Sequence, residues 1–298
     1  DKHVTGVQTC ALPISAMKYK IIEISPVSGA LGAEVSGVDL SEPVTKQALT
    51  EIKSAWLEHQ VLFFRDQTLT PDQHVAFTKN FGELQGPGYM PTLDGYPNVY
   101  VQEYPGLYGG IVSDVNWHID ASFMEKPLKG AVLYALDVPD VGGDTAWVNL
   151  YAAYESLSKP MQKLCASLTA IHDNLHKNLT AVLETYGAKG YAMARQATPP
   201  TEHPLVCKHP ETGKKCLFYS ELLISHFKEL TAEENKILKE FLQQHIQKPE
   251  LYCRFKWENN SIAFWDNRCT AHKGIFDFGQ SHRLMHRVAI QGETVPSK

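Results

Sequence analysis

The sequence lacks several features that would place it at once in a special class of protein. None of its six cysteines lies in a CxxC pair or a zinc-finger spacing, which argues against a zinc module and against a disulfide framework. No apolar stretch approaches the roughly 20 residues needed to span a bilayer. The net charge is only −5 and no long basic block offsets it, which argues against general nucleic-acid binding. We therefore expect a cytoplasmic protein without membrane or nucleic-acid partners.

The first residues differ from the rest of the chain. Val4 to Ile14 read VTGVQTCALPI, a peptide that a common sequencing-library adapter can encode. A natural flexible leader is the alternative, and both interpretations predict that residues 1–16 have no role in the fold. We expect the natural start at Met17 and one domain over residues 17–298, because no boundary signal divides this part of the chain.

Helices and many short strands are predicted along the chain. Helices are expected at 45–59, 70–81, 150–157, 160–168 and 231–246, where apolar spacing follows capping residues such as Thr70 and Thr231. Strands are expected at 61–64, 99–102, 117–120, 130–136, 145–148, 205–209, 217–220, 252–257, 261–265 and 284–291, with two more between 19 and 37. This pattern predicts a mainly β fold with flanking helices, either a sandwich or a jelly roll.

Two segments are expected to cover a site. Residues 82–115 are rich in glycine, proline and tyrosine, which is typical of a loop-rich lid that carries specificity. Residues 173–204 are polar, lack clean periodicity and separate core strands, which indicates an insertion over the site.

The run Asn116-Trp117-His118-Ile119-Asp120 contains a candidate metal-binding pair. In a strand, residues i and i+2 point to the same face, so His118 and Asp120 can hold one ion. Far downstream, His272 would complete two histidines and one carboxylate, the facial triad of non-haem Fe(II) oxygenases. Such a triad leaves coordination positions open, whereas a structural zinc site closes its shell. A histidine two residues before an aspartate is common by chance, so the motif alone is a weak signal.

Two arginines follow the last candidate ligand. In a strand from Arg283, the side chains of Arg283, Met285 and Arg287 share one face. Two guanidinium groups inside a barrel are unfavourable unless anions meet them, and their planar shape suits a carboxylate or a sulfonate. A surface strand is the alternative, with three possible acidic partners: Asp266, Asp277 and Glu293.

From residue 19 to residue 293 the chain resembles the TauD/TfdA family of taurine-dioxygenase-like, Fe(II)- and 2-oxoglutarate-dependent oxygenases. The resemblance lies in HQVLFFRDQ (59–67), FGEL (81–84), NWHID (116–120), GGDT (142–145), WDNR (265–268) with His272, and RLMHR (283–287). It implies a double-stranded β-helix, a distorted jelly roll whose sheets enclose the iron. This agrees with the strand pattern.

The resemblance also implies roles for individual residues. The triad would be the catalytic metal ligands for Fe(II), Arg283 and Thr145 would bind the far carboxylate of 2-oxoglutarate, and Trp265 would border that pocket. Arg287 would face the anionic head group of the substrate. The implied reaction uses O2, converts 2-oxoglutarate to succinate and CO2, and hydroxylates a substrate carbon.

The lid departs from the pattern of taurine-specific members. Those members have a histidine and a tyrosine after FGEL, whereas this chain continues QGPGYM (85–90) without the histidine. Asp114 replaces an asparagine, and its charge would weaken binding of a sulfonate. Tyr89, Met90 and Asp114 are therefore candidate substrate residues. Further aromatic residues, which ordinary packing would also explain, suggest a substrate larger or less polar than taurine: Tyr104, Tyr108 and Phe123.

These observations predict a dioxygenase for a small acidic substrate, such as taurine or a related sulfonate. An alkyl sulfate, an aryloxyalkanoate, or a carboxylic or amino acid is the alternative within the class. A noncatalytic metal-binding jelly-roll sensor is the alternative outside it, although such a protein has little use for a carboxylate clamp beside an open-sided metal. The family resemblance also allows a homo-oligomer.

Overall fold

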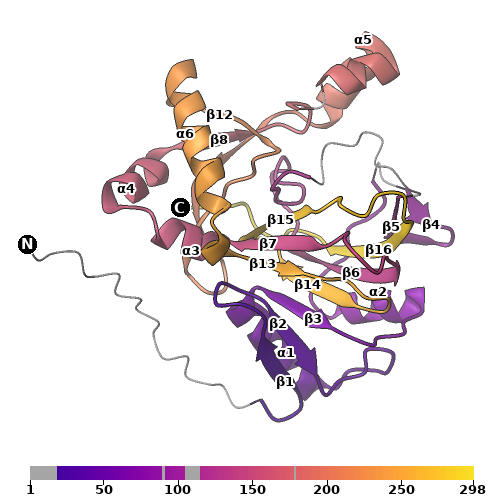
Figure 1. Ribbon diagram of the computed structural model, residues 1–298. Coiled ribbons are helices and arrows are strands. Elements are labelled where there is room, and N and C mark those ends of the chain that lie inside the picture. Colours follow the sequence, from indigo (N-terminus) through magenta and orange to yellow (C-terminus); the bar gives the residue numbers. More distant parts are fainter. Residues whose placement is uncertain (1–18, 89–90, 105–114, 178) are drawn as a thin grey trace, which may run out of the picture.

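The computed structural model describes residues 19–88, 91–104, 115–177 and 179–298. The expected leader and the candidate residues Tyr89, Met90, Tyr108 and Asp114 lie outside these ranges. In the described part of the chain, two β-sheets form the centre of the molecule and helices flank them (Figure 1). No helix in this part combines the length and apolar character needed to cross a bilayer.

The larger sheet has eight strands among the described residues, in the order β1-β2-β3-β14-β6-β16-β5-β4. These strands are β1 (Glu23–Pro26), β2 (Ala33–Ser36), β3 (Val61–Phe64), β4 (Thr92–Leu93), β5 (Tyr96–Tyr104), β6 (Gly130–Asp137), β14 (Ile262–Asp266) and β16 (Arg283–Ile290). The pair β2-β3 is parallel and the other neighbours are antiparallel. The central strands β3 and β14 are buried along their whole length, as their apolar runs predict.

A second sheet, in the order β13-β7-β15, faces the first. Its strands are β7 (Thr145–Asn149), β13 (Tyr252–Phe255) and β15 (Thr270–Gly274). Apolar side chains from both sheets meet between them, and the rings of Phe63 and Phe255 stack with their centroids 4.0 Å apart. The two sheets therefore form a sandwich with one shared core.

Two helices cover the outer face of the larger sheet. Helix α1 (Lys46–His59) buries Trp56, whose ring stacks on Phe264 of β14 at 4.4 Å. Helix α2 (Pro71–Lys79) begins at the predicted cap, because Thr70 and Gln73 form a capping box.

Four further helices lie away from α1, on the other side of the sheets (Figure 1). They are α3 (Leu150–Glu155), α4 (Lys159–Ser167), α6 (Ala232–Ile246) and, apart from these three, α5 (Leu179–Ala197). Short strands and one 3-10 turn accompany these helices: β8 (Thr169–His172), β9 (Thr201–Pro204), β10 (Val206–Lys208), β11 (Lys215–Leu217), β12 (Ile224–Phe227) and η1 (Pro249–Leu251). The predicted helices at 150–157, 160–168 and 231–246 are confirmed.

Three local predictions need correction. Residues 117–120 do not form a strand; His118 makes only an isolated bridge with His272, and Ala121 turns the chain with a φ of 52°. The expected insertion at 173–204 contains helix α5, whose periodicity is broken where Gly187 adopts a φ of 66°. Part of the expected loop-rich lid, β5, is a regular strand of the larger sheet that pairs with β16.

Candidate active site

Two separate backbone segments bring the candidate metal ligands together. At the bridge, His118 and His272 each donate a backbone N–H to the carbonyl oxygen of the other at 2.9 Å. Oδ1 of Asp120 lies 3.6 Å from Nε2 of His118 and 3.9 Å from Nε2 of His272. All three residues are buried, and the ligand atoms of the group lie within 4.8 Å of one another.

The orientation of His118 suits a metal ligand. Its Nδ1 lies 2.8 Å from the carbonyl oxygen of Asn116, which can only accept a hydrogen bond. Nδ1 therefore carries the proton, and the lone pair of Nε2 points toward Asp120. Two donor atoms that bind one ion at about 2.1 Å are at most about 4.2 Å apart, so both measured distances fit a shared ion.

Asp120 is held as a carboxylate. Its Oδ2 accepts a hydrogen bond from Nη1 of Arg287 at 3.1 Å. Burial opposes ionisation, but the neighbouring Arg287 and, after it, His272 and His118 outweigh burial and lower the pKa of Asp120 to about 2. One carboxylate oxygen thus faces the arginine and the other faces the two imidazoles, which favours metal binding through Oδ1.

The candidate cosubstrate residues come from both sheets. Arg283 begins β16, is 6% exposed, and donates from Nε to the carbonyl oxygen of Gly143 at 3.3 Å. Thr145 begins β7, and its Oγ1 accepts a hydrogen bond from Nε1 of Trp257 at 3.0 Å. The hydroxyl proton of Thr145 can therefore be donated to an anion. The role of Arg283 and Thr145 as a carboxylate clamp stays a prediction.

Trp265 lies next to the candidate ligand His272. The centroids of the two rings are 4.9 Å apart. The indole Nε1 of Trp265 is buried and has no hydrogen-bond partner among the described residues. Buried donors are normally satisfied, so this N–H is suited to a bound polar ligand.

A tight turn places Thr145 at the start of its strand. Gly142 and Gly143 have φ values of 81° and 72°, and Gly143 N–H donates to Oδ1 of Asp277 at 2.9 Å. A Cβ atom on Gly142 would lie only 2.7 Å from that oxygen. The GGDT motif thus has a steric as well as a conformational reason for its glycines.

The two arginines of β16 lie on one face, as the alternation predicts. Each is opposite a tyrosine of β5: Arg283 pairs with Tyr104 and Arg287 with Tyr100. The guanidinium carbons lie 5.8 Å and 5.6 Å from the centroids of these rings. The surface-strand alternative fails, because Arg283 is buried and its three suggested acidic partners pair with other cations, namely Arg268, Arg254 and Lys129.

Comparison with known proteins agrees with this geometry. Residues 23–289 match the family described as taurine catabolism dioxygenase TauD, TfdA family. The chain belongs to the TauD/TfdA family. It is a 2-oxoglutarate-dependent dioxygenase with the jelly-roll fold, as the sequence predicted.

Individual relatives of this dioxygenase cover nearly the whole chain. An alpha-ketoglutarate-dependent sulfate ester dioxygenase of Pseudomonas putida is 33% identical over 91% of this chain and 90% of its own length. An alkylsulfatase of Acinetobacter baylyi is 31% identical over 91% of this chain and 86% of its own length. The crystal structure of a taurine dioxygenase from Burkholderia xenovorans has a TM-score of 0.79, with 33% identity over 94% of this chain and 95% of its own.

The dioxygenase contains a second group of potential ligands that the sequence did not predict: His209, Asp266 and Cys269. Nδ1 of His209 accepts hydrogen bonds from the backbone N–H groups of Glu211 and Thr212, so Nε2 carries the proton and donates to Asp266 at 3.0 Å. Arg268 donates to both carboxylate oxygens, at 2.8 and 2.7 Å. Burial raises the pKa of the Cys269 thiol well above its ordinary range. Without a ligand lone pair on the imidazole, this group is a structural network.

The segment expected to cover the site, residues 173–204, forms hydrogen bonds to residues just before His118 and just after Asp120. Lys177 donates to Oδ1 of Asn116 at 3.3 Å, before His118. Oγ1 of Thr201 donates to the carbonyl oxygen of Phe123 at 2.6 Å, after Asp120. The segment 173–204 is thus anchored beside the candidate ligands, and its function as a cover stays a prediction.

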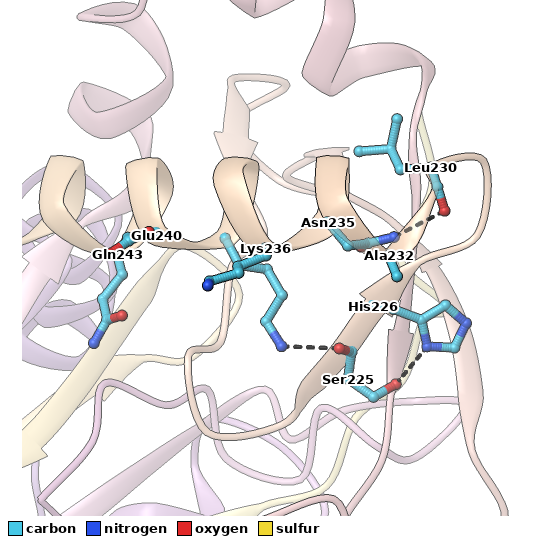
Figure 2. Close-up of a pocket in the computed structure, with 9 residues that line it drawn as sticks. Ser225, His226, Leu230, Ala232, Asn235, Lys236, Glu240 and Gln243 are labelled. Carbon is cyan, nitrogen blue, oxygen red and sulfur yellow. Dashed lines mark hydrogen bonds between the residues drawn. The ribbon is translucent and has the colours of Figure 1, made fainter.

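An open hollow elsewhere in the molecule does not belong to this site. It has a volume of about 690 Å³ and lies along α6, between residues such as Ser225, Lys236 and Gln243 (Figure 2). None of the candidate metal or cosubstrate residues lines it.

Proposed function

We propose that this dioxygenase binds Fe(II) through His118, Asp120 and His272 and hydroxylates a small organic anion that carries a sulfonate or sulfate-ester head group. The observation that carries the proposal is the position of Arg287. This arginine lies 3.1 Å from the carboxylate of Asp120, with 11% of its side chain exposed. An anionic substrate that reaches Arg287 is therefore beside the metal-binding atoms.

The donor set supports Fe(II) in this proposal. Two neutral imidazoles and one carboxylate form the facial triad that leaves positions open for a cosubstrate and O2. Bound iron would supply the activation of O2, which these side chains cannot perform. The protein would contribute position and charge, because Asp120 stays ionised at neutral pH and Asn116 keeps His118 in the tautomer that binds metal.

Arg283 and Thr145 are proposed to bind the far carboxylate of 2-oxoglutarate. The guanidinium can offer paired N–H donors and the hydroxyl can offer one more. Trp265 would close one side of the pocket and exclude water from it. A solved structure of AAD-2 in complex with Mn(II) and N-oxalylglycine is 27% identical to this chain with a TM-score of 0.79, which supports a metal in the fold.

The substrate class follows from charge and from the relatives. Arg287 offers a planar fork to an –SO3⁻ group, and the tyrosine ring of Tyr100 flanks it. The sulfate ester dioxygenase and the alkylsulfatase act on substrates with this head group, according to their names. Hydroxylation at the carbon that bears the head group makes that carbon collapse to a carbonyl, and the head group leaves as sulfate or sulfite.

A product screen tests the proposal. Purified protein is incubated aerobically with Fe(II), ascorbate and 2-oxoglutarate, together with alkanesulfonates, alkyl sulfates or aryloxyacetates in separate reactions. We expect succinate to form in the same molar amount as the sulfite or sulfate that is released. Release of phenol from aryloxyacetates with neither sulfite nor sulfate from the other substrates would overturn the head-group assignment. Absence of substrate-dependent succinate from the whole panel would contradict the substrate class.

Two variants test the division of roles. Arg287→Ala should raise the KM for the primary substrate by about 10- to 100-fold, because it removes a charge-assisted contact of about 1.5–3 kcal/mol. It should leave the affinity for 2-oxoglutarate in the presence of metal within about threefold of wild type. Arg283→Ala should show the reverse pattern. An equal loss of 2-oxoglutarate binding in both variants would contradict the assignment.

A further inference from the structure

The buried side chain of Asn267 forms hydrogen bonds with both the backbone N–H and the backbone carbonyl oxygen of Asp120. Its Oδ1 accepts a hydrogen bond from Asp120 N–H at 2.8 Å, and its Nδ2 donates to the carbonyl oxygen of Asp120 at 2.9 Å. Nδ2 also donates to the carbonyl oxygen of Leu128 at 2.9 Å. One side-chain amide therefore replaces the two hydrogen bonds that a neighbouring strand would have made.

The backbone of Asp120 depends on these two hydrogen bonds because, among the described residues, it does not pair with a neighbouring strand. His118 and His272 hold each other through their backbone bridge, but Asp120 lies in a turn just before Ala121, whose φ is positive. Without Asn267, a buried N–H and a buried carbonyl would lose their partners, at about 1–3 kcal/mol each. The backbone would then move to recover hydrogen bonds and would carry the carboxylate with it.

Asn267 itself is fixed by the turn that joins β14 to β15. The network of Asp266, Arg268 and His209 holds one side of this turn, and Oγ1 of Thr270 donates to the Asp266 carbonyl oxygen at 2.8 Å. The backbone N–H of Asn267 donates to the carbonyl oxygen of Lys129 at 3.1 Å. Trp265 precedes the turn in β14 and His272 follows it in β15, so the turn that holds Asp120 through Asn267 also joins the strands of two other candidate site residues.

We propose that Asn267 is a positioning residue that sets the place of Asp120 relative to the two histidines, and that the buried network behind it keeps Asn267 in place. The inference rests on the proposed iron site. Asn267 does not touch the metal-binding atoms; it acts through the backbone of Asp120.

The chain offers a matched control in Asn235, on α6. Asn235 brackets Phe227 in the same way: Oδ1 accepts from Phe227 N–H at 2.6 Å and Nδ2 donates to its carbonyl oxygen at 3.1 Å. It also donates to the carbonyl oxygen of Leu230, as Figure 2 shows. Asn235 is likewise buried, and it lies along the hollow beside α6 rather than with the candidate ligands.

The test measures metal binding to the full-length apoprotein without turnover. Anaerobic titrations with Fe(II) and Co(II) give dissociation constants for wild type, Asn267→Ala, Asn267→Ser, Asn235→Ala and Asp120→Ala, and thermal unfolding reports the stability of each apoprotein. We expect Asn267→Ala to bind both ions about 10- to 100-fold more weakly, the range found for residues that orient metal ligands. The visible absorption of bound Co(II) should change, because it reports coordination geometry.

Asn235→Ala separates positioning from stability. It should lower the unfolding temperature, yet bind metal within about twofold of wild type. Asn267→Ser, which retains one polar group but cannot bracket both backbone atoms, provides a second arm if the alanine variant does not fold.

Two different failures can be told apart. The first failure is that every Asn267 variant that folds keeps the wild-type metal affinity and Co(II) absorption, while Asp120→Ala loses binding. In that case the positioning role is overturned and the iron site stands. If Asp120→Ala binds metal as tightly as wild type, the proposed iron site is wrong and the inference falls with it.

Discussion

Two buried groups of histidine and aspartate in this molecule have similar composition and opposite character. In the first, Asp120 presents one oxygen to two imidazole Nε2 atoms and the other to Arg287. In the second, both oxygens of Asp266 accept from Arg268, and one also accepts from His209. The comparison shows that hydrogen-bond saturation, more than residue type, distinguishes a ligand set from a structural network.

The charge of the carboxylates does not distinguish the two groups. In both, burial opposes ionisation and neighbouring cations outweigh it, so the pKa of Asp120 falls to about 2 and that of Asp266 falls well below its ordinary range. The imidazoles differ instead. His118 donates from Nδ1 and turns its Nε2 lone pair to the site, whereas His209 accepts at Nδ1 and donates from Nε2.

The largest expected effect is the loss of metal from the first group. Asp120→Ala should weaken Fe(II) binding by more than about 100-fold, beyond the range expected for residues that only orient ligands. Metal-dependent succinate formation should fall with it. Anaerobic titration measures the affinity, and the circular dichroism spectrum serves as the control for folding. If Asp120→Ala kept the wild-type affinity for Fe(II), the first group could no longer be distinguished from the second as the metal-binding one.

Mutation in the second group, that of His209, Asp266 and Cys269, should lower the stability of the protein. Asp266→Ala leaves Arg268 and His209 buried without their common partner, which should lower the free energy of unfolding by about 3–5 kcal/mol. Urea unfolding of the apoprotein measures the change. A fully stable Asp266→Ala protein with no metal affinity would reverse the assignment of the two groups.

The pH dependence of stability should also trace to Asp266. Its folded pKa lies below the ordinary value of 3.8, so its stabilising contribution is present above about pH 4 and is lost as the pH falls through the folded pKa. The difference in unfolding free energy between wild type and Asp266→Asn should therefore shrink as the pH is lowered from 5 toward 2. A constant difference over this range would show that ionisation of Asp266 does not stabilise the fold.

The smallest effect is expected at the outer end of the same network. Glu211 accepts a hydrogen bond from Arg268 at 2.7 Å, and Lys53 contacts Glu211 at 2.7 Å with 49% of its own side chain exposed. Lys53→Ala should change the unfolding free energy by less than about 1 kcal/mol, as is usual for exposed ion pairs. Thermal unfolding at low and high salt measures this. If Lys53→Ala lowered the free energy of unfolding as much as Asp266→Ala, the stability of the network would depend on its exposed ion pair between Lys53 and Glu211.

Much of the fold was predictable because the signals are local. The capping box at Thr70 and the buried run of β3 each lie within a few residues, and helix α1 follows its apolar spacing. Helix α5 was missed because Gly187 interrupts its periodicity. The strand at 117–120 was predicted from an alternation that the backbone does not follow, because Asp120 bonds to a side chain instead of a neighbouring strand.

The sequence by itself determined the family, the reaction class and the identity of the candidate ligands, because these depend on residue types in recognisable motifs. It could not rank the two histidine-aspartate groups or assign a role to Asn267. That residue and Asp120 are 147 positions apart, and a hydrogen bond acts only over about 3 Å. Only the tertiary structure decides which partners each polar atom meets, and those partners separate the candidate metal site from the network behind it.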